Sequence, residues 1–134
     1  MTARRGRARA GITTVAAVAL GLGLLLGGCH SGRNPQVRTV PGGSADQGKR
    51  AIEHFGCGSC HTIPGVKGAN GLVGPPLIKF SRRGYIAGML PNTANNLEHW
   101  IQDPQSVVRG NDMPNLGVSA SQARDITAYL YTLG

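Results

Sequence analysis

Apolar residues recur at helical spacing in three segments of the chain, which are separated by long stretches rich in glycine and proline. The first segment opens with Ser-Ala-Asp-Gln at residues 44–47, which has the form of a capping box and predicts a helix through about Phe55. The second predicted helix covers residues 95–102, with Thr93 as its cap and Pro104 as its stop, because proline cannot continue a helix.

The third predicted helix is the clearest, because a second capping box at residues 119–122 opens it and apolar side chains then recur to about Leu133. The apolar faces of the three helices contain Ala51, Ile52, Phe55, Leu97, Trp100, Ile101, Ala123, Ile126, Leu130 and Leu133. No run alternates apolar and polar residues for long enough to predict a strand. We therefore expect an all-α fold of three to four helices with long loops, which is unusual unless the loops lie against something rigid.

The N-terminal residues have the pattern of an export signal. Residues 1–11 carry four arginines and no acid, and residues 12–26 are apolar apart from threonine and glycine. This apolar run of about 15 residues is short against the ~20 that a membrane-spanning helix needs, so a cleaved signal peptide is favoured over a transmembrane anchor. Leu-Gly-Gly-Cys at residues 26–29 resembles a bacterial lipobox, which implies cleavage before Cys29 and acylation of that cysteine. The alternative is ordinary signal-peptide cleavage with Cys29 incidental.

We therefore divide the chain into a signal peptide at residues 1–28, a lipidated flexible tether at 29–43 and a folded domain at 44–134. The tether has no apolar face and is rich in glycine, proline and polar residues. Removing the signal peptide lowers the formal net charge from +8 to +4, because four of the 14 Lys and Arg leave and all six acids remain. No basic stripe interleaved with aromatic residues is left, so nucleic acid is not expected as a partner.

Cys-Gly-Ser-Cys-His at residues 57–61 is the strongest chemical signal in the chain. Zinc would need about four ligands, and the chain offers no second Cys or His pair at matching spacing. A redox dithiol expects a βαβ pattern, and a plain disulfide would leave His61 without a role. Cys-x-x-Cys-His is the signature of covalent haem attachment, so we predict one haem c bound through Cys57 and Cys60. A buried macrocycle would also explain why the folded part has only six aromatic residues.

The spacing also assigns His61 to the haem iron. Two thiols three residues apart can reach both vinyl carbons at one porphyrin edge, and the neighbouring histidine then becomes the proximal ligand. Met113 is the candidate for the second axial position, because its polar and proline neighbours in Gly-Asn-Asp-Met-Pro-Asn do not suit a core residue. Three alternatives fit less well: Met89 is interpreted as a packing residue, His99 as an exposed helix residue and His54 as poorly oriented.

Several stretches together resemble class I cytochromes c, namely GKRAIEHFGCGSCHT, VGPPL, MP and ITAYLYTL, and they span essentially all of residues 44–134. The succession LPNT, NL, WI and DPQ ahead of Met-Pro is similar to the cytochrome c domain attached to subunit II of bacterial haem-copper terminal oxidases. The resemblance implies the class I cytochrome c fold, with loops wrapped round a covalent haem. It implies thioether bonds at Cys57 and Cys60, with His61 and Met113 as the two axial ligands of the iron.

The same resemblance implies three supporting roles. Pro75 matches the proline whose carbonyl accepts the ring N–H of the haem histidine, which would fix the orientation of the imidazole. Trp100 and either Arg82 or Arg83 match positions near the haem propionates, where an indole N–H or a guanidinium can bind a carboxylate. Ordinary packing or surface roles are the alternative for these last residues.

The first and last helices of such a domain cross closely, and Gly48 and Tyr129 resemble the positions at that crossing. In one respect the chain departs from the oxidase subunit, which also carries a copper-binding domain with its own Cys and His cluster. The sequence contains no such cluster. The resemblance therefore supports an oxidase as a partner without establishing it.

Iron held by both histidine and methionine has no open position, so we expect a one-electron carrier with no small-molecule substrate rather than an enzyme. Its expected redox partners are a quinol-oxidising complex as donor and a terminal oxidase as acceptor. Lipid anchoring would hold it at a membrane of the bacterial cell envelope, facing the periplasm or the outer side. A candidate rim for docking an acidic partner consists of Lys67, Lys79, Arg82 and Arg83. Two alternatives remain: a permanent cytochrome subunit of an oxidase or dehydrogenase complex, and a haem sensor or enzyme with a displaceable methionine.

Overall fold

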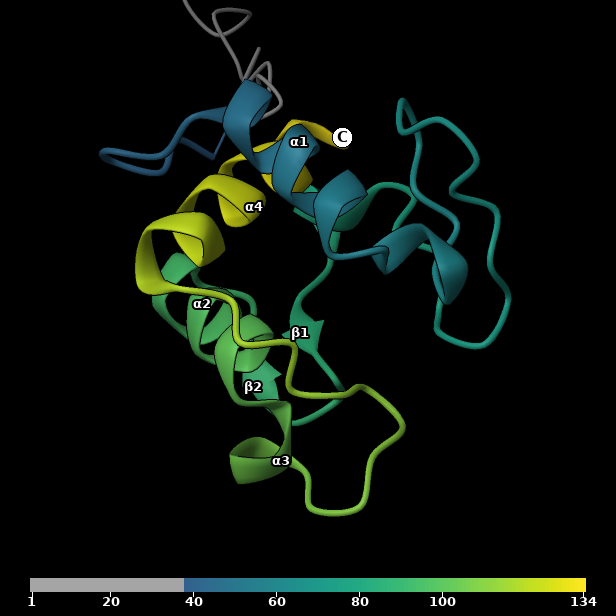
Figure 1. The fold of residues 1–134 in the computed structure, drawn as a ribbon. Coiled ribbons are helices and arrows are strands. Elements are labelled where there is room, and N and C mark those ends of the chain that lie inside the picture. Colours follow the sequence, from purple (N-terminus) through teal and green to yellow (C-terminus); the bar gives the residue numbers. More distant parts are fainter. Residues whose placement is uncertain (1–37) are drawn as a thin grey trace, which may run out of the picture. The chain divides into compact units, whose positions relative to one another are not determined.

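The computed structural model describes residues 38–134, where four α-helices are joined by long loops (Figure 1). The elements in chain order are α1 (Ala45–His54), the 3-10 turns η1 (Cys57–Ser59) and η2 (Phe80–Arg82), the strands β1 (Tyr85–Ile86) and β2 (Leu90–Pro91), and the helices α2 (Ala94–Gln102), α3 (Pro104–Val107) and α4 (Ala120–Thr132). The predicted all-α fold is confirmed. The predicted signal peptide and Cys29 lie outside the described residues.

Helix α1 begins at the predicted cap but uses it differently. The Ser44 hydroxyl accepts the Gln47 N–H at 3.4 Å, as expected for an N-cap. The Ser44 N–H, which a full capping box would give to Gln47, instead donates to Asp125 of α4 at 2.8 Å. At α4 the predicted box is complete, with Ser119 and Gln122 each accepting from the other's backbone N–H. The hydrogen bond to Asp125 therefore replaces one of the two hydrogen bonds of the first capping box.

Helices α1 and α4 cross in contact, and a glycine allows their close approach (Figure 1). A Cβ atom added to Gly48 would lie 1.9 Å from the carbonyl oxygen of Asp125, so only glycine fits there. This confirms the predicted place of Gly48 at the crossing. The hydroxyl of Tyr129, on α4, donates to the carbonyl of Pro64 at 2.7 Å, which links α4 to the loop after the Cys-x-x-Cys-His motif.

Pro104 was predicted to end the second helix, and it also begins a third one. Helix α2 ends at Gln102, and Asp103 then caps α3 by accepting the Ser106 N–H at 3.3 Å. Proline suits the first position of a helix, because its missing N–H would have had no partner there. The same residue therefore stops one helix and starts the next.

The structure also contains two short strands, which the alternation of apolar and polar residues did not predict. Tyr85 pairs with Pro91 and Ile86 with Leu90, which is too few residues for a period of two to be visible. The turn between the strands contains Met89, whose side chain is 62% exposed. The interpretation of Met89 as a packing residue is therefore wrong.

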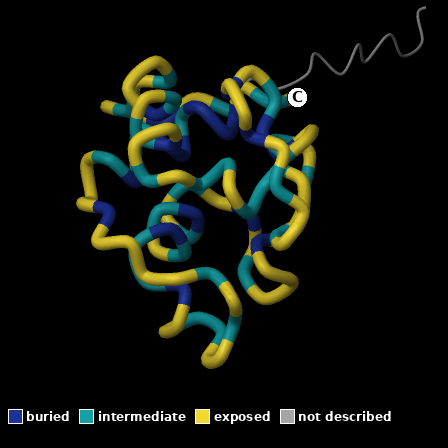
Figure 2. The backbone as a smooth tube through the Cα atoms, turned by 45° about the vertical axis from the view of Figure 1, so that its right-hand side comes forward, coloured by how far each residue is buried: buried dark blue, intermediate teal, exposed yellow. Residues whose placement is uncertain are grey.

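The core lies among α1, α2 and α4, and the loops form the more exposed parts of the surface (Figure 2). Its most deeply buried apolar residues are Ile52, Ile63, Ile86, Leu97, Ala123, Ile126, Leu130 and Tyr131. Val40 is also buried, and the Arg38 guanidinium donates to the Asn92 carbonyl at 2.5 Å, so the last residues of the predicted tether pack against the domain. Within residues 38–134 no helix is long and apolar enough to cross a membrane.

Candidate functional site

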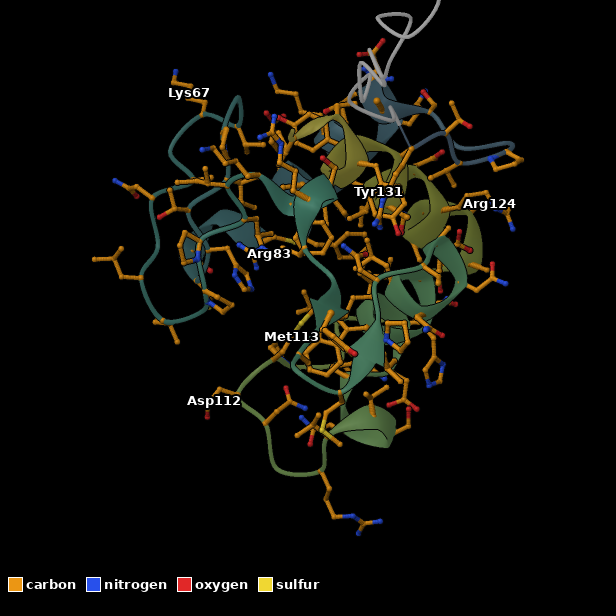
Figure 3. All side chains as sticks on the ribbon, turned by 180° about the vertical axis from the view of Figure 1, so that it is seen from behind. Lys67, Arg83, Asp112, Met113, Arg124 and Tyr131 are labelled. Atoms are coloured by element: carbon orange, nitrogen blue, oxygen red, sulfur yellow. The ribbon has the colours of Figure 1, made fainter. Side chains whose placement is uncertain are left out.

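A cavity of about 400 Å³ opens between the Cys-x-x-Cys-His motif and the loop that joins α3 to α4. Seven of the eight residues predicted to bind the cofactor line it: Cys57, Cys60, His61, Pro75, Arg83, Trp100 and Met113. Arg82 is exposed and does not line the cavity. The remaining lining is largely apolar and includes core residues of all three long helices, such as Ile52, Leu97 and Ile126. Figure 3 shows that Arg83 and Met113 approach this region from different loops.

The two cysteines of the motif lie in a tight turn at the end of α1. Gly56 adopts a left-handed conformation with φ 67°, which ends α1 and lets the chain turn into η1. The N–H groups of Cys60 and His61 both donate to the carbonyl of Cys57, at 3.3 and 3.0 Å. This winding places Cys57, Cys60 and His61 together on one wall of the cavity.

The surroundings of the Cys57 thiol do not favour a redox dithiol. Cys57 and Cys60 are both free and half-buried. Burial raises the pKa of the Cys57 thiol above its usual value, a backbone hydrogen bond lowers it, and the neighbouring Cys60 raises it. A reactive dithiol needs the opposite, a lowered pKa that favours the thiolate. Burial therefore favours the protonated thiol of Cys57 over the thiolate.

The imidazole of His61 is held in one tautomer. Its Nδ1 lies 2.8 Å from the carbonyl oxygen of Pro75, and a carbonyl can only accept, so Nδ1 carries the proton and donates. The Nε2 atom therefore keeps its lone pair and can bind a metal ion. The ring also lies against Gly74, where an added Cβ would be 2.3 Å from Cε1. Gly74 is thus a site residue that the sequence analysis missed, although it stands in the quoted Val-Gly-Pro-Pro-Leu stretch.

Met113 lies on the opposite wall, in the loop between α3 and α4, with its side chain half-buried. The other candidates for an iron ligand do not line the cavity. Met89 is exposed in the turn between the strands, and His99 lies 3.1 Å from the Ser106 hydroxyl on the surface. His54 lines a separate surface depression beside α4. Among the described residues, His61 and Met113 are the histidine and the methionine that face the cavity.

The structure separates the two candidate arginines. Arg83 lines the cavity, its guanidinium lies 5.2 Å from the centre of the Phe80 ring, and it donates to the carbonyls of Pro76 and Ile78. Trp100, on α2, is half-buried and lines the same cavity. The sequence could not distinguish Arg82 from Arg83, because adjacent residues at the end of a short turn differ only in the direction they take in the fold.

Zinc chemistry finds no support in the described part of the chain. Residues 38–134 contain no group of three or more His, Cys, Asp or Glu side chains placed to hold a metal ion. A structural zinc site usually needs four such ligands. The cavity instead offers two thiols, one imidazole nitrogen and one thioether.

The comparison with known families decides the assignment, because the family model described as cytochrome c matches residues 45–134. The chain belongs to the cytochrome c family. This family supports haem c, with its iron, as the cofactor and electron transfer as the role. When bound, haem c supplies an iron that exchanges one electron between its ferric and ferrous states. The donor set of the cavity fits this group, since it joins two thiols and an imidazole on one wall with a thioether on the other.

Similar curated proteins are cytochrome c oxidase subunit 2 chains. The chain is 40% identical over 90 residues to that of Alkalihalophilus pseudofirmus, a match covering 66% of this chain and 25% of the relative. It is 30% identical over 92 residues to that of Bacillus subtilis, covering 67% and 26%, and 33% identical over 87 residues to that of Bacillus sp. strain PS3, covering 62% and 24%. The match thus spans about a quarter of each relative. No solved structure matches the chain.

Proposed function

We propose that the protein is a membrane-anchored one-electron carrier in which Cys57 and Cys60 bind one haem c and His61 and Met113 hold its iron. The observation that carries this proposal is the cavity that brings all four side chains together, although Met113 is far from the motif in the sequence. With the haem joined to the two cysteines, the neighbouring His61 would hold its iron. The Pro75 carbonyl keeps the lone pair of Nε2 available for that bond.

Coordination by Met113 gives the site its expected function. If His61 and Met113 both held the iron, no place would be left on it for a substrate, and methionine ligation would raise the reduction potential. The largely apolar lining would keep water away from the haem. The protein would therefore carry electrons rather than transform a small molecule.

The proposed partners and location rest on the sequence pattern and on the names of the relatives. The relatives are oxidase subunits, which supports a terminal oxidase as the electron acceptor. The proposed donor is a quinol-oxidising complex. An acyl group on Cys29 would hold the domain at the outer face of a bacterial membrane and restrict its diffusion to that surface. Such confinement raises the effective concentration of the carrier near membrane-bound partners.

One optical and mass measurement on the purified mature protein tests the cofactor and the anchor together. The expected mass is that of the chain from Cys29 with acyl groups and one haem, and the haem should resist extraction by acidified organic solvent. Replacing Cys57 and Cys60 with serine should make the haem extractable, while the matched control Ser59→Ala should not. A wild-type protein without covalent haem would overturn the proposal.

The two neighbouring arginines provide a matched test of the edge of the site. We assign Arg83 and Trp100 to binding the haem carboxylates, because both line the cavity and Arg82 does not. Removing the positive charge near the iron should lower its reduction potential, because the ferric state carries one more positive charge than the ferrous state and is disfavoured by a nearby cation. Arg83→Gln is therefore expected to lower the potential more than Arg82→Gln does. Equal shifts in both variants would count against the assignment.

Exposed basic residues between the Cys-x-x-Cys-His motif and β1 support docking to an acidic partner. Lys67, Lys79 and Arg82 are all exposed in this part of the chain. Attraction between exposed charges weakens as salt shortens the screening length, so electron transfer to an oxidase should slow from low to moderate ionic strength. A rate that does not change with salt would remove electrostatic steering from the proposal.

A permanent oxidase subunit is the second candidate, and the names of the relatives favour it. The ligands of the iron would be the same in both cases, so the site does not distinguish them. Gentle detergent extraction does. A shuttle should be released alone, whereas a subunit should purify with the oxidase in a fixed ratio.

A further inference from the structure

Two side-chain amides bond to the backbone of Met113 and of the residues just before it. The Nε2 group of Gln105, on α3, donates to the carbonyl of Met113 at 3.1 Å and to that of Asn111 at 2.9 Å. The Oε1 atom of Gln105 accepts the Gly110 N–H at 2.9 Å. One side chain therefore bonds to three backbone groups of the loop that carries Met113.

Asn111 completes the attachment from the other direction. Its Oδ1 atom accepts the Met113 N–H at 2.8 Å. Its Nδ2 group donates to the carbonyls of Pro104 and Val108, at 3.0 and 2.6 Å, which ties the loop to both ends of α3. The N–H and the carbonyl of Met113 are thus both bonded to side chains that rest on one short helix.

No backbone hydrogen bond does the same work in this loop. Within the described residues, the backbone groups from Asp112 to Val118 make no hydrogen bond to another backbone group. Without Gln105 and Asn111 the segment would keep the covalent chain, the Gly117 contact to Asn115 at 3.0 Å and the packing of Val118. The position of Met113 therefore depends on these two amides.

We propose that Gln105 and Asn111 are positioning residues that keep the Met113 thioether at the cavity and so hold the sixth position of the iron closed. This inference rests on the proposed function, in which Met113 is the distal ligand. A flexible loop would lose conformational entropy each time Met113 bound the iron, and a loop already ordered by Gln105 and Asn111 avoids that loss. The bond from methionine to iron is thereby favoured over an external ligand.

Competition with imidazole measures this effect on the haem-loaded protein. External imidazole can bind ferric iron only when Met113 has left, so its apparent affinity reports the fraction of open sites. Gln105→Ala and Asn111→Ala should each lower the apparent Kd for imidazole about threefold to tenfold, as expected for the loss of one net hydrogen bond. At a fixed, subsaturating imidazole concentration, the far-red absorption band of ferric iron bound to methionine sulfur should be weaker in these variants than in the wild type.

Matched variants separate positioning from a general loss of stability. Asn115→Ala removes an amide from the same loop that bonds to Gly117, and Gln102→Ala removes one that bonds within α2, so both should leave imidazole binding unchanged. Asn111→Asp keeps the acceptor for the Met113 N–H but turns a carboxylate oxygen towards the Pro104 and Val108 carbonyls, so it should also lower the apparent Kd for imidazole. Gln105→Glu keeps the acceptor for Gly110 and gives the same measurement if the alanine variant does not retain haem.

The outcomes distinguish the two proposals. A wild-type protein that lacks the methionine-to-iron band would overturn the distal role of Met113 itself. A wild-type protein with that band, together with Gln105 and Asn111 variants that bind imidazole no more tightly than Asn115→Ala, would overturn the positioning role alone.

Discussion

The two walls of the cavity are built by different means. On the wall that carries His61, the carbonyls of Gly58, Cys60 and Thr62 accept backbone N–H groups from the loop that follows, at 3.1, 2.8 and 2.8 Å. On the wall that carries Met113, side-chain amides take the place of such backbone bonds. One wall is therefore fixed by the path of the main chain and the other by two replaceable side chains.

Glycines allow the backbone contacts of the His61 wall. An added Cβ would lie 2.7 Å from Ala69 at Gly58, 2.3 Å from the Ser59 carbonyl oxygen at Gly71, and 2.3 Å from the His61 ring at Gly74. None of these positions has room for a side chain. The contrast teaches that His61 belongs to a region in which main chain packs on main chain, whereas Met113 is held mainly by side-chain amides.

The largest effect on the free energy of unfolding is expected from a substitution that disrupts the packing of the His61 wall. Gly74→Ala would place a methyl group 2.3 Å from the His61 ring, and neither the ring nor the backbone at Gly74 can move without losing a hydrogen bond. We expect the free energy of unfolding of the haem-loaded protein to fall by about 3 kcal/mol, measured by urea titration. Gly84→Ala is the control, because no atom lies within 4 Å of its added Cβ. Similar losses in both variants would contradict the contrast between the walls.

A buried amide sharpens the comparison, because it uses the chemistry of the Met113 wall inside the core. Asn92 is 6% exposed, and its Nδ2 group donates to the carbonyls of Phe80 and Arg83 at 3.2 and 3.0 Å. Asn92→Ala would leave these buried acceptors and the Tyr131 hydroxyl without their partner, at a cost of about 2 kcal/mol of unfolding free energy.

The matched control for Asn92 is an exposed asparagine nearby. Asn95→Ala lies on the surface of α2 and should change the free energy of unfolding by less than about 0.5 kcal/mol in the same urea titration. If Asn92→Ala also stays within that range, the buried amide does not stabilise the segment that carries Arg83.

The sequence predicts the features that depend on local chemistry. Helix α4 is predicted by its capping box and by the helical spacing of its apolar residues. The chemistry of the His61 wall is predicted by the pentapeptide at residues 57–61. Met113 was predicted as an iron ligand partly because its neighbours are polar. Such neighbours suit a residue whose backbone is held by hydrogen bonds rather than by packing. Pro104 shows the limit of such local rules, because a residue that ends one helix can also begin another.

Features that depend on distant contacts could not be predicted in the same way. Gly74 matters only because the loop returns to His61, and Asn92 only because Phe80 and Arg83 fold over it. Arg38 was placed in a flexible tether, since nothing nearby in the sequence indicates that it reaches Asn92 and the Tyr131 ring. The residues in these contacts are between 9 and 93 positions apart in the sequence. No local pattern therefore predicts the contacts.

The smallest expected effect concerns the hydroxyl at the other side of Asn92, and it depends on pH. Tyr131 donates to the Asn92 carbonyl oxygen Oδ1 at 3.1 Å, so Tyr131→Phe should cost about 1 kcal/mol of unfolding free energy at neutral pH.

Burial raises the pKa of Tyr131, an effect that the nearby Arg38 partly offsets. The folded protein therefore binds the phenol proton more tightly than the unfolded chain does. This stabilisation is complete below the unfolded pKa of about 10 and is lost as pH rises from there towards the folded pKa. Urea titrations across this alkaline range should thus show a shallower decline in Tyr131→Phe than in the wild type. Some decline should remain, because burial also raises the pKa of Tyr129. An identical slope in the two proteins would mean that Tyr131 titrates alike in the folded and unfolded chains.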